Sequence, residues 1–295
     1  MSSEILFRAM PEIMSGEAVA SKPSHIKRAN NLDGATWTRN SVSIWSDIRK
    51  SRDEIKLGHP AVFPCQLVSR LINCFSWGNG LYVLDPFCGS GSTLVAASQM
   101  GHIGIGFEIN RQYIDLAKQR LSIANIWQSN ELSAGGKTKI YEDDARNILK
   151  YIPENTIDMV ITSPPYWNIL SQKRTADLKN IRDYGDTTND LAKISSYQDF
   201  LSQLSDVFKQ VFAVMKPRAY CIVVVMDLRK KNKFYPFHSD VARFMEEIGF
   251  TYDDLIIWDR RHEYNNLRPL GYPAVFRINK VHEYLLIFQK PAKSG

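Results

Sequence analysis

The chain has few cysteines, no clustered metal ligands and no long apolar run. Its four cysteines are scattered without a CxxC pair, so neither a disulfide framework nor structural zinc is expected, and a reducing cytoplasm fits. The six histidines lack the spacing of metal ligands. No apolar run could span a membrane, and the N-terminus lacks the basic start and apolar core of a signal peptide. We therefore expect a cytoplasmic protein that binds neither metal nor membrane.

The bulk composition is that of a globular protein with a basic excess. Of the 295 residues, 44% are hydrophobic and 23% are charged, which provides enough apolar chain for a large core. One α/β domain with appendages and two domains both fit this length. The net charge of +6 favours a polyanionic partner, although charge alone is weak support for nucleic-acid binding.

Short apolar runs alternate with helical patterns from residue 81 onward. Strands are expected at 81–85, 103–108, 137–145, 157–163, 219–227, 254–258 and 283–290, and helices at 92–101, 110–125, 197–215 and 238–248. This alternation predicts an α/β fold with a mostly parallel sheet and helices on both faces, whose last strand is antiparallel. Residues 1–40 are polar and are interpreted as an N-terminal arm.

The stretch VLDPFCGSGST (83–93) predicts a nucleotide-type cofactor site. It follows a strand and opens a helix, and two glycines allow a tight turn with close ligand approach. The third glycine of a dinucleotide fingerprint and the Gly-Lys-Ser/Thr of a phosphate loop are both missing. Asp85 at the turn repels phosphate and suits a cationic ligand, and Glu108 ends the next strand at the spacing of a ribose-binding acid. S-adenosylmethionine meets these demands; a plain glycine-rich turn is the alternative.

The stretch TSPPYW (162–167) ends another strand in a stiff corner. The two prolines fix φ and donate no hydrogen bonds, so carbonyls at this corner are left as acceptors. Ser163 and the Pro164 carbonyl are suited to accept the two hydrogens of an exocyclic amino group, and Tyr166 to stack on its base. Since carboxyl ends of parallel strands meet at one edge, this corner and the glycine turn should share a crevice. A strand-ending turn with a core aromatic is the alternative.

Together these motifs resemble the S-adenosylmethionine-dependent DNA amino-methyltransferases, which act on cytosine N4 or adenine N6. DPFCGSGST is similar to their cofactor motif, TSPPYW to their catalytic motif, HPAVFP (59–64) to the segment over the methionine end, and HEYLLIF (282–288) to a late strand. The resemblance implies a Rossmann-like class I methyltransferase fold with a seven-stranded sheet in residues 41–295. One departure is that similar sequences usually place the catalytic motif first, so chain order does not locate the DNA-recognition element.

The resemblance also implies roles for individual residues. The catalytic set is Ser163, Pro164, Pro165 and Tyr166. The cofactor set is His59, Pro60, Phe63, Asp85, Phe87, Cys88, Gly89, Ser90 and Gly91, with Glu108 on the ribose and Asp144, or its neighbour Asp143, on the adenine. A serine at the first catalytic position is typical of the cytosine-N4 form and an aspartate of the adenine-N6 form.

Basic loops after strand ends are the expected DNA contacts. They lie near 168–196, 228–237 and 259–281, and a solvated loop is the alternative for each. The candidate residues are Trp167, Lys173, Arg174, Arg229, Lys230, Lys231, Arg260, Arg261 and Arg268.

We therefore expect a site-specific methyltransferase that methylates N4 of a flipped cytosine in double-stranded DNA. Adenine N6 is the alternative target, and a non-catalytic nucleic-acid-binding protein or an RNA substrate are alternatives of other classes. The resemblance also raises a cognate restriction endonuclease as a partner and leaves open whether the chain is a monomer or a dimer.

Overall fold

The computed structural model describes residues 29–56, 64–128, 138–167, 190–264, 267 and 269–292. Its α-helices are α1 (Gly34–Asn40), α2 (Arg52–Lys56), α3 (Cys65–Phe75), α4 (Ser92–Gln99), α5 (Arg111–Gln128), α6 (Tyr197–Val214) and α7 (Phe237–Ile248). Its strands are β1 (Ile44–Trp45), β2 (Tyr82–Asp85), β3 (Ile103–Glu108), β4 (Lys139–Glu142), β5 (Ile157–Thr162), β6 (Met215–Val225), β7 (Leu228–Lys230), β8 (Lys233–Tyr235), β9 (Thr251–Asp259) and β10 (His282–Gln289). Short 3₁₀ helices are η1 (Ala145–Lys150), η3 (Leu191–Lys193) and η4 (Arg261–Glu263).

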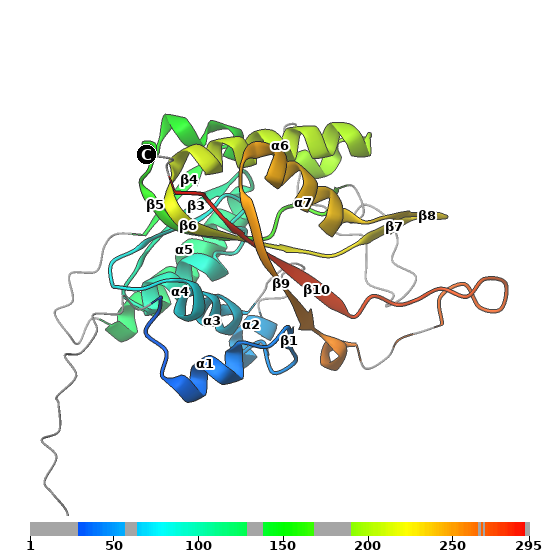
Figure 1. The fold of residues 1–295 in the computed structure, drawn as a ribbon, viewed down its shortest axis with the longest axis horizontal. Helices are drawn as coiled ribbons and strands as arrows, with labels where there is room; N and C mark the ends of the chain where they lie inside the picture. Colours follow the sequence, from blue (N-terminus) through cyan, green and yellow to red (C-terminus); the bar gives the residue numbers. More distant parts are fainter. Residues whose placement is uncertain are drawn as a thin grey trace, which may run out of the picture.

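Eight strands form the main sheet in the order β1-β9-β10-β6-β5-β2-β3-β4 (Figure 1). β10 runs antiparallel to both of its neighbours, and the other pairs in the sheet are parallel, which confirms the predicted mostly parallel sheet with an antiparallel last strand. The strand count differs from the predicted seven because β1 adds to the edge beside β9. A two-residue strand has no readable alternation, so the sequence pattern could not show it.

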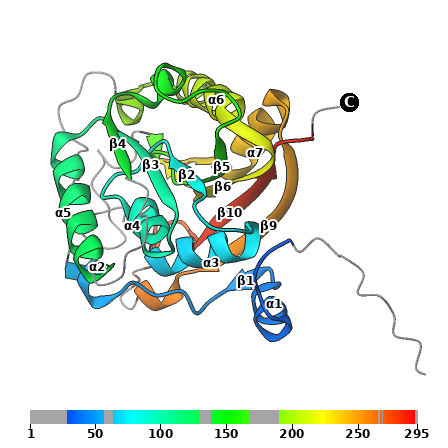
Figure 2. The same cartoon turned by 90° about the vertical axis from the view of Figure 1, so that its left-hand side faces the viewer.

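Helices cover both faces of the sheet (Figure 2). α3, α4 and α5 lie on one face, and α6 and α7 lie on the other. β5 is buried between these layers, and its successive side chains belong to opposite cores: Val160 joins the core under α6, while Met159 and Ile161 join the core under α3. Burial on both faces is why β5 reads as a continuous apolar run.

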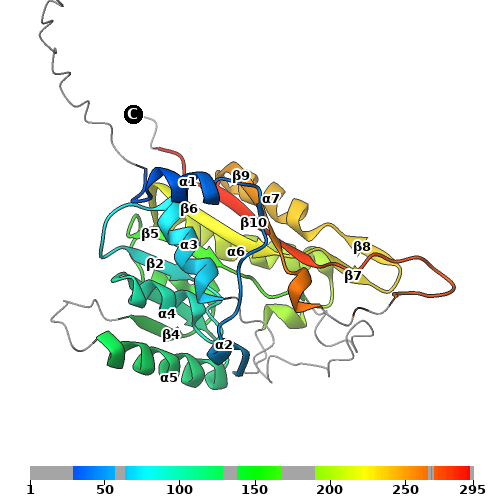
Figure 3. The same ribbon diagram turned by 90° about the horizontal axis from the view of Figure 1, so that it is seen from below.

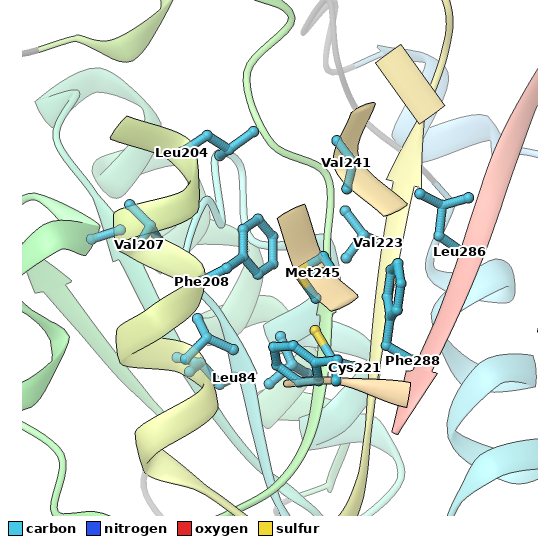
Figure 4. Close-up of a cluster of buried hydrophobic side chains, with 14 of the residues drawn as sticks. Leu84, Leu204, Val207, Phe208, Cys221, Val223, Val241, Met245, Leu286 and Phe288 are labelled. Atoms are coloured by element: carbon cyan, nitrogen blue, oxygen red, sulfur yellow. The ribbon is translucent and has the colours of Figure 1, made fainter. Parts of the chain in front are cut away.

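The larger core lies beneath α6 and α7 (Figure 4). α6 presents Leu204, Val207 and Phe208 on one stripe with helical spacing, and each of these side chains is fully buried. They pack with Met245 of α7 and Val223 of β6. Each such side chain contributes about 1.5–3 kcal/mol by leaving water, so this stripe anchors α6 to the sheet.

A buried lysine closes the C-terminal end of α6. Lys290 is 9% exposed, and its Nζ donates to the carbonyls of Phe212 and Met215, both at 2.7 Å, and to Asn155 Oδ1 at 3.2 Å. The ammonium group therefore satisfies carbonyls that the last helical turn leaves without amide partners, and its charge complements the helix dipole.

Replacing Lys290 with methionine should lower the free energy of unfolding by about 2–3 kcal/mol, because buried carbonyls lose a charged donor. Urea unfolding monitored by circular dichroism measures this change. Lys209→Met, on the exposed side of α6, is the control and should shift stability by less than about 0.5 kcal/mol. Equal stability of the two variants would contradict the capping role.

Two segments predicted to lack regular structure contain it. Within the polar arm, Asp33 caps α1 by accepting from the Thr36 amide at 2.9 Å. Within the predicted loop 228–237, β7 and β8 pair as an antiparallel hairpin. Both elements are too short for a periodic pattern. No helix within the described ranges is long and apolar enough to cross a bilayer, and within those ranges no cluster of three metal-ligating side chains occurs.

Candidate active site

The two motif strands are neighbours in the sheet. β2 pairs with β5 in parallel, with Val83 opposite Met159, so both strands end at the same edge. The strand ends are joined directly, because the Thr162 hydroxyl donates to Asp85 Oδ1 at 2.7 Å. The Thr93 hydroxyl donates to Asp85 Oδ2, also at 2.7 Å. Thr93 lies in the first turn of α4, and this hydrogen bond gives it a structural role.

Asp85 is a buried structural centre of the site. It is 1% exposed, and besides the two threonine hydroxyls it accepts from the Phe87 amide at 3.1 Å. Burial raises its pKa to about 6 despite the hydrogen bonds from Thr93 and Thr162. Its carboxylate thus ties the glycine turn, the catalytic strand and α4 together.

The glycine turn approaches its neighbours very closely. Gly91 has φ of 80°, in the left-handed region, and a Cβ there would lie 2.9 Å from Cβ of Ala117 on α5. Gly106 of β3 leaves space for Cys88, whose Sγ would lie 2.7 Å from an added Cβ. Arg120, which also lies on α5, donates to the Ser90 carbonyl at 2.7 Å. These contacts hold the turn in one conformation.

Glu108 lies at the carboxyl end of β3 and is bonded to the glycine turn. Its Oε2 accepts from the Gly89 amide at 2.9 Å, and its Oε1 accepts from the amides of Ile109 and Asn110 at 2.9 and 2.8 Å. Burial nevertheless raises its pKa to about 7, against these three hydrogen bonds. A carboxyl group that titrates near neutrality inside a cleft is typical of a functional site.

Asp143 and Asp144 follow β4 at the same sheet edge. Asp144 pairs with Arg146 and caps η1. Asp143 accepts from the Tyr151 hydroxyl at 2.6 Å, and this hydrogen bond lowers its pKa. Both carboxylates are therefore held in place by neighbours.

One cavity joins the two motifs. It measures about 920 Å³, a volume that includes the solvent at its open mouth. Its walls contain every predicted catalytic residue and most of the predicted cofactor residues: Ser163, Pro164, Pro165, Tyr166, Phe87, Cys88, Gly89, Ser90, Glu108, Asp143 and Asp144. Asp85 and Gly91, which were also predicted to hold the cofactor, are not among the lining residues. The predicted residues His59, Pro60 and Phe63 lie outside the described residues.

The cavity also contains residues that sequence reasoning missed. Phe107, Ile109 and Tyr113 line it from β3 and the start of α5, and Asp190 and Leu191 line it beside the catalytic corner. Asp190 is 7% exposed and accepts from the Ala192 amide at 2.8 Å as the cap of η3. The only sequence signal for Asp190 is an aspartate before a short helical turn, which occurs too often to mark a site.

Among the predicted DNA contacts, Trp167 is largely internal. It is 3% exposed, and its indole donates to the Ile194 carbonyl at 2.8 Å. The rings of Tyr197 and Tyr235 pack on it, and Lys230 Nζ lies 4.1 Å from its ring centroid. This packing argues against direct stacking of Trp167 on a base, and instead docks the β7–β8 hairpin on the catalytic corner. Arg229 and Lys231 on this hairpin are exposed.

Arg260 and Arg261 are both paired with carboxylates. Arg260 is ion-paired with Glu263 and Glu283 and lies over the Trp258 ring, with its side chain 16% exposed. A guanidinium held in this way is poorly placed to reach a phosphate, which argues against a DNA contact by Arg260. Arg261 is more exposed and pairs with Asp259 at 2.6 Å. The other predicted contacts, Lys173, Arg174 and Arg268, lie outside the described residues.

The strand order, the glycine turn and the acids at the strand ends define a class I methyltransferase with a Rossmann-like sheet, as predicted. The chain belongs to the DNA methylase family of N6 and N4 methyltransferases, whose family model matches residues 16–119 and 157–294. The family is S-adenosylmethionine-dependent, in agreement with the predicted cofactor.

The chain is similar in part of its length to several DNA methyltransferases. Type II methyltransferase M.ScaI of Streptomyces caespitosus is 36% identical over 28% of this chain and 29% of its own length. DNA adenine methyltransferase YhdJ of Escherichia coli is 34% identical over 39% of each chain. The matched part is thus well under half of either relative. The crystal structure of TTHA0409 from Thermus thermophilus, complexed with S-adenosyl-L-methionine, is 26% identical over 50% of this chain and 51% of that chain, with a TM-score of 0.35.

Proposed function

We propose that this protein transfers a methyl group from S-adenosylmethionine to the exocyclic N4 amino group of a flipped cytosine in duplex DNA. The observation that supports this most is the shared cavity, which both the glycine turn and the Ser163–Tyr166 corner line. A chain that only bound nucleic acid would need neither the acids nor the acceptors of this cavity.

The residues of the cavity fit S-adenosylmethionine. Glu108 offers a carboxylate for ribose hydroxyls, and Asp144 or Asp143 offers an acceptor for the adenine amino group. The apolar side chain of Ile109 suits a purine face, and the carboxylates suit a ligand without phosphates. When bound, the cofactor supplies an activated methyl group on a sulfonium.

The catalytic corner is suited to hold an aromatic amine. Such an amine is a poor nucleophile because its lone pair is delocalised into the ring. Ser163 Oγ and the Pro164 carbonyl would accept its two hydrogens and shift the nitrogen toward tetrahedral geometry, while Tyr166 stacks on the base. The fixed φ of Pro164 and Pro165 keeps these acceptors in place before the base arrives. The reaction therefore needs no covalent intermediate.

Ser163 at the first catalytic position favours cytosine N4 over adenine N6. The adenine alternative has support of its own, because one similar protein is named a DNA adenine methyltransferase. Several others are named type II methyltransferases, which supports the expectation of a restriction endonuclease as partner.

Sequencing a plasmid from an expressing host, with a method that separates N4-methylcytosine from N6-methyladenine, tests the proposal. We expect N4-methylcytosine at one short repeated sequence, absent when the host expresses Ser163→Ala. N6-methyladenine at such a sequence would overturn the choice of base. An unmethylated plasmid, together with cofactor binding by calorimetry and preferential methylation of RNA in vitro, would overturn the choice of substrate.

A further inference from the structure

A basic hairpin and an apolar ribbon project together beyond the carboxyl edge of the sheet (Figures 1 and 3). The hairpin is β7–β8, and the ribbon consists of residues 269–281 in the connection from β9 to β10. Two contacts link them: Arg277 donates to Asn232 Oδ1 at 3.0 Å, and Lys280 Nζ lies 4.6 Å from the Phe234 ring centroid. We call these two segments the arm.

The arm is strongly basic. Residues 228–235 and 269–281 contain six lysines and arginines and no acidic residue, which equals the net charge of the whole chain. Arg229 and Lys231 are exposed on the hairpin. Such a concentration of positive charge is suited to a polyanionic partner. Contacts to phosphates require only that the charged side chains come close enough to them.

The tip of the arm is apolar and ordered. Phe276 is 94% exposed and Ile278 is 73% exposed, while Leu270 and Arg277 form an antiparallel bridge across the turn. The Val275 amide donates to the Gly271 carbonyl at 2.7 Å, and an added Cβ at Gly271 would lie 2.3 Å from the Val275 carbonyl oxygen. A tight turn thus holds large apolar side chains in water, which is unfavourable unless a partner covers them.

The base of the arm is fixed to the catalytic corner. Lys230 and Tyr235 of the hairpin pack against Trp167, the residue that follows Tyr166. The position of the arm is therefore coupled to that of the corner, and a duplex held by the arm is held relative to the cavity.

We propose that the arm grips duplex DNA, with the basic side chains on phosphates and with Phe276 and Ile278 wedged against the bases at a step outside the target base. The inference rests on the proposed function for the choice of DNA. Exposed apolar side chains flanked by basic residues are also found in proteins that insert an apolar wedge between base steps. Such proteins kink the duplex by roughly 20–90°. A second copy of this chain would instead be repelled by the charge of the arm.

The test uses the full-length protein and a 30-base-pair duplex cut from the plasmid, labelled with a dye at each end. Wild-type protein should bring the dyes closer on binding, as energy transfer reports. The double variant F276A/I278A should lose at least half of this change and weaken binding by no more than about tenfold. R229A/K231A should reduce the slope of log Kd against log salt by about 1.8, since two phosphate contacts are lost.

Trp77→Ala is the matched control, because Trp77 is 58% exposed and lies before β2 at the amino edge of the sheet. It should change neither readout. Melting temperatures of all variants should match wild type, since the substituted side chains are exposed. If F276A/I278A gave the same change in energy transfer as wild type, the proposed wedge would be overturned. If wild type were a dimer in sedimentation and this variant a monomer, the tip would be assigned to self-association. Because binding and bending are measured without turnover, a failure of the arm proposal can be distinguished from a failure of the proposed methyl transfer.

Discussion

Ser163→Ala should lower the rate of methyl transfer by about 100-fold while leaving cofactor affinity unchanged. Removing one preorganised hydrogen-bonding partner of the reacting group costs about that factor in other enzymes. The substitution removes an acceptor for the amino group, and the hydrogen bonds that Asp85 accepts from Phe87, Thr93 and Thr162 do not involve the Ser163 side chain. Incorporation of radiolabelled methyl groups into plasmid DNA measures turnover, and calorimetry with S-adenosylhomocysteine measures binding.

Two further variants sharpen this test. Ser163→Asp keeps an acceptor oxygen at the position and should retain more activity than Ser163→Ala. Ser202→Ala, on the exposed side of α6, should behave as wild type. If Ser163→Ala weakened cofactor binding as much as turnover, the serine would belong to the cofactor site and the proposed handling of the amine would be wrong.

Cofactor affinity should rise about tenfold between pH 6 and pH 8. Burial raises the pKa of Glu108 to about 7, and ribose hydroxyls would donate to its ionised form. Below pH 7 the carboxyl is mostly protonated, so binding must first release a proton; above pH 7 that cost disappears. The folding stability of the ligand-free protein should change with pH in the opposite direction. A raised carboxyl pKa contributes stability that is present below pH 4.5 and is lost as the pH rises through 7.

Calorimetry with S-adenosylhomocysteine in buffers of different ionisation enthalpy measures both the affinity and the proton release. Glu108→Gln should weaken binding at pH 8 by at least tenfold and remove the step near pH 7. A step near pH 6 that persists in this variant is assigned to Asp85, whose pKa is raised to about 6 by burial. Retention of the full pH dependence by Glu108→Gln would contradict a ribose contact through this carboxylate.

Much of the cavity could be predicted from local sequence because parallel strands end at one edge. Asp85, Glu108 and Ser163 each end or directly follow an apolar run, and that position alone brings them to the same crevice. The glycines of the turn could likewise be recognised, since only a residue without Cβ tolerates the backbone of Gly91 and its closeness to Ala117.

Side-chain partners far apart in sequence could not be predicted. Arg260 and Trp167 were both predicted from the sequence to contact DNA. In the structure Arg260 pairs with Glu283, and Trp167 packs on Tyr197 and Tyr235. A local sequence pattern does not distinguish an arginine that is free to bind DNA from one that is paired within the protein. For Arg260 the pairing carboxylate comes from a distant strand, β10, which contains Glu283.

Residue identity and short-range periodicity were enough to predict the family, the two motifs and the alternation of strands and helices. Three further features became visible in the folded chain: Thr162 and Thr93 converge on Asp85, Asp190 joins the cavity, and the hairpin and the ribbon form one arm. Each of these depends on contacts between distant segments, which form when the chain buries its apolar faces and which no local pattern records.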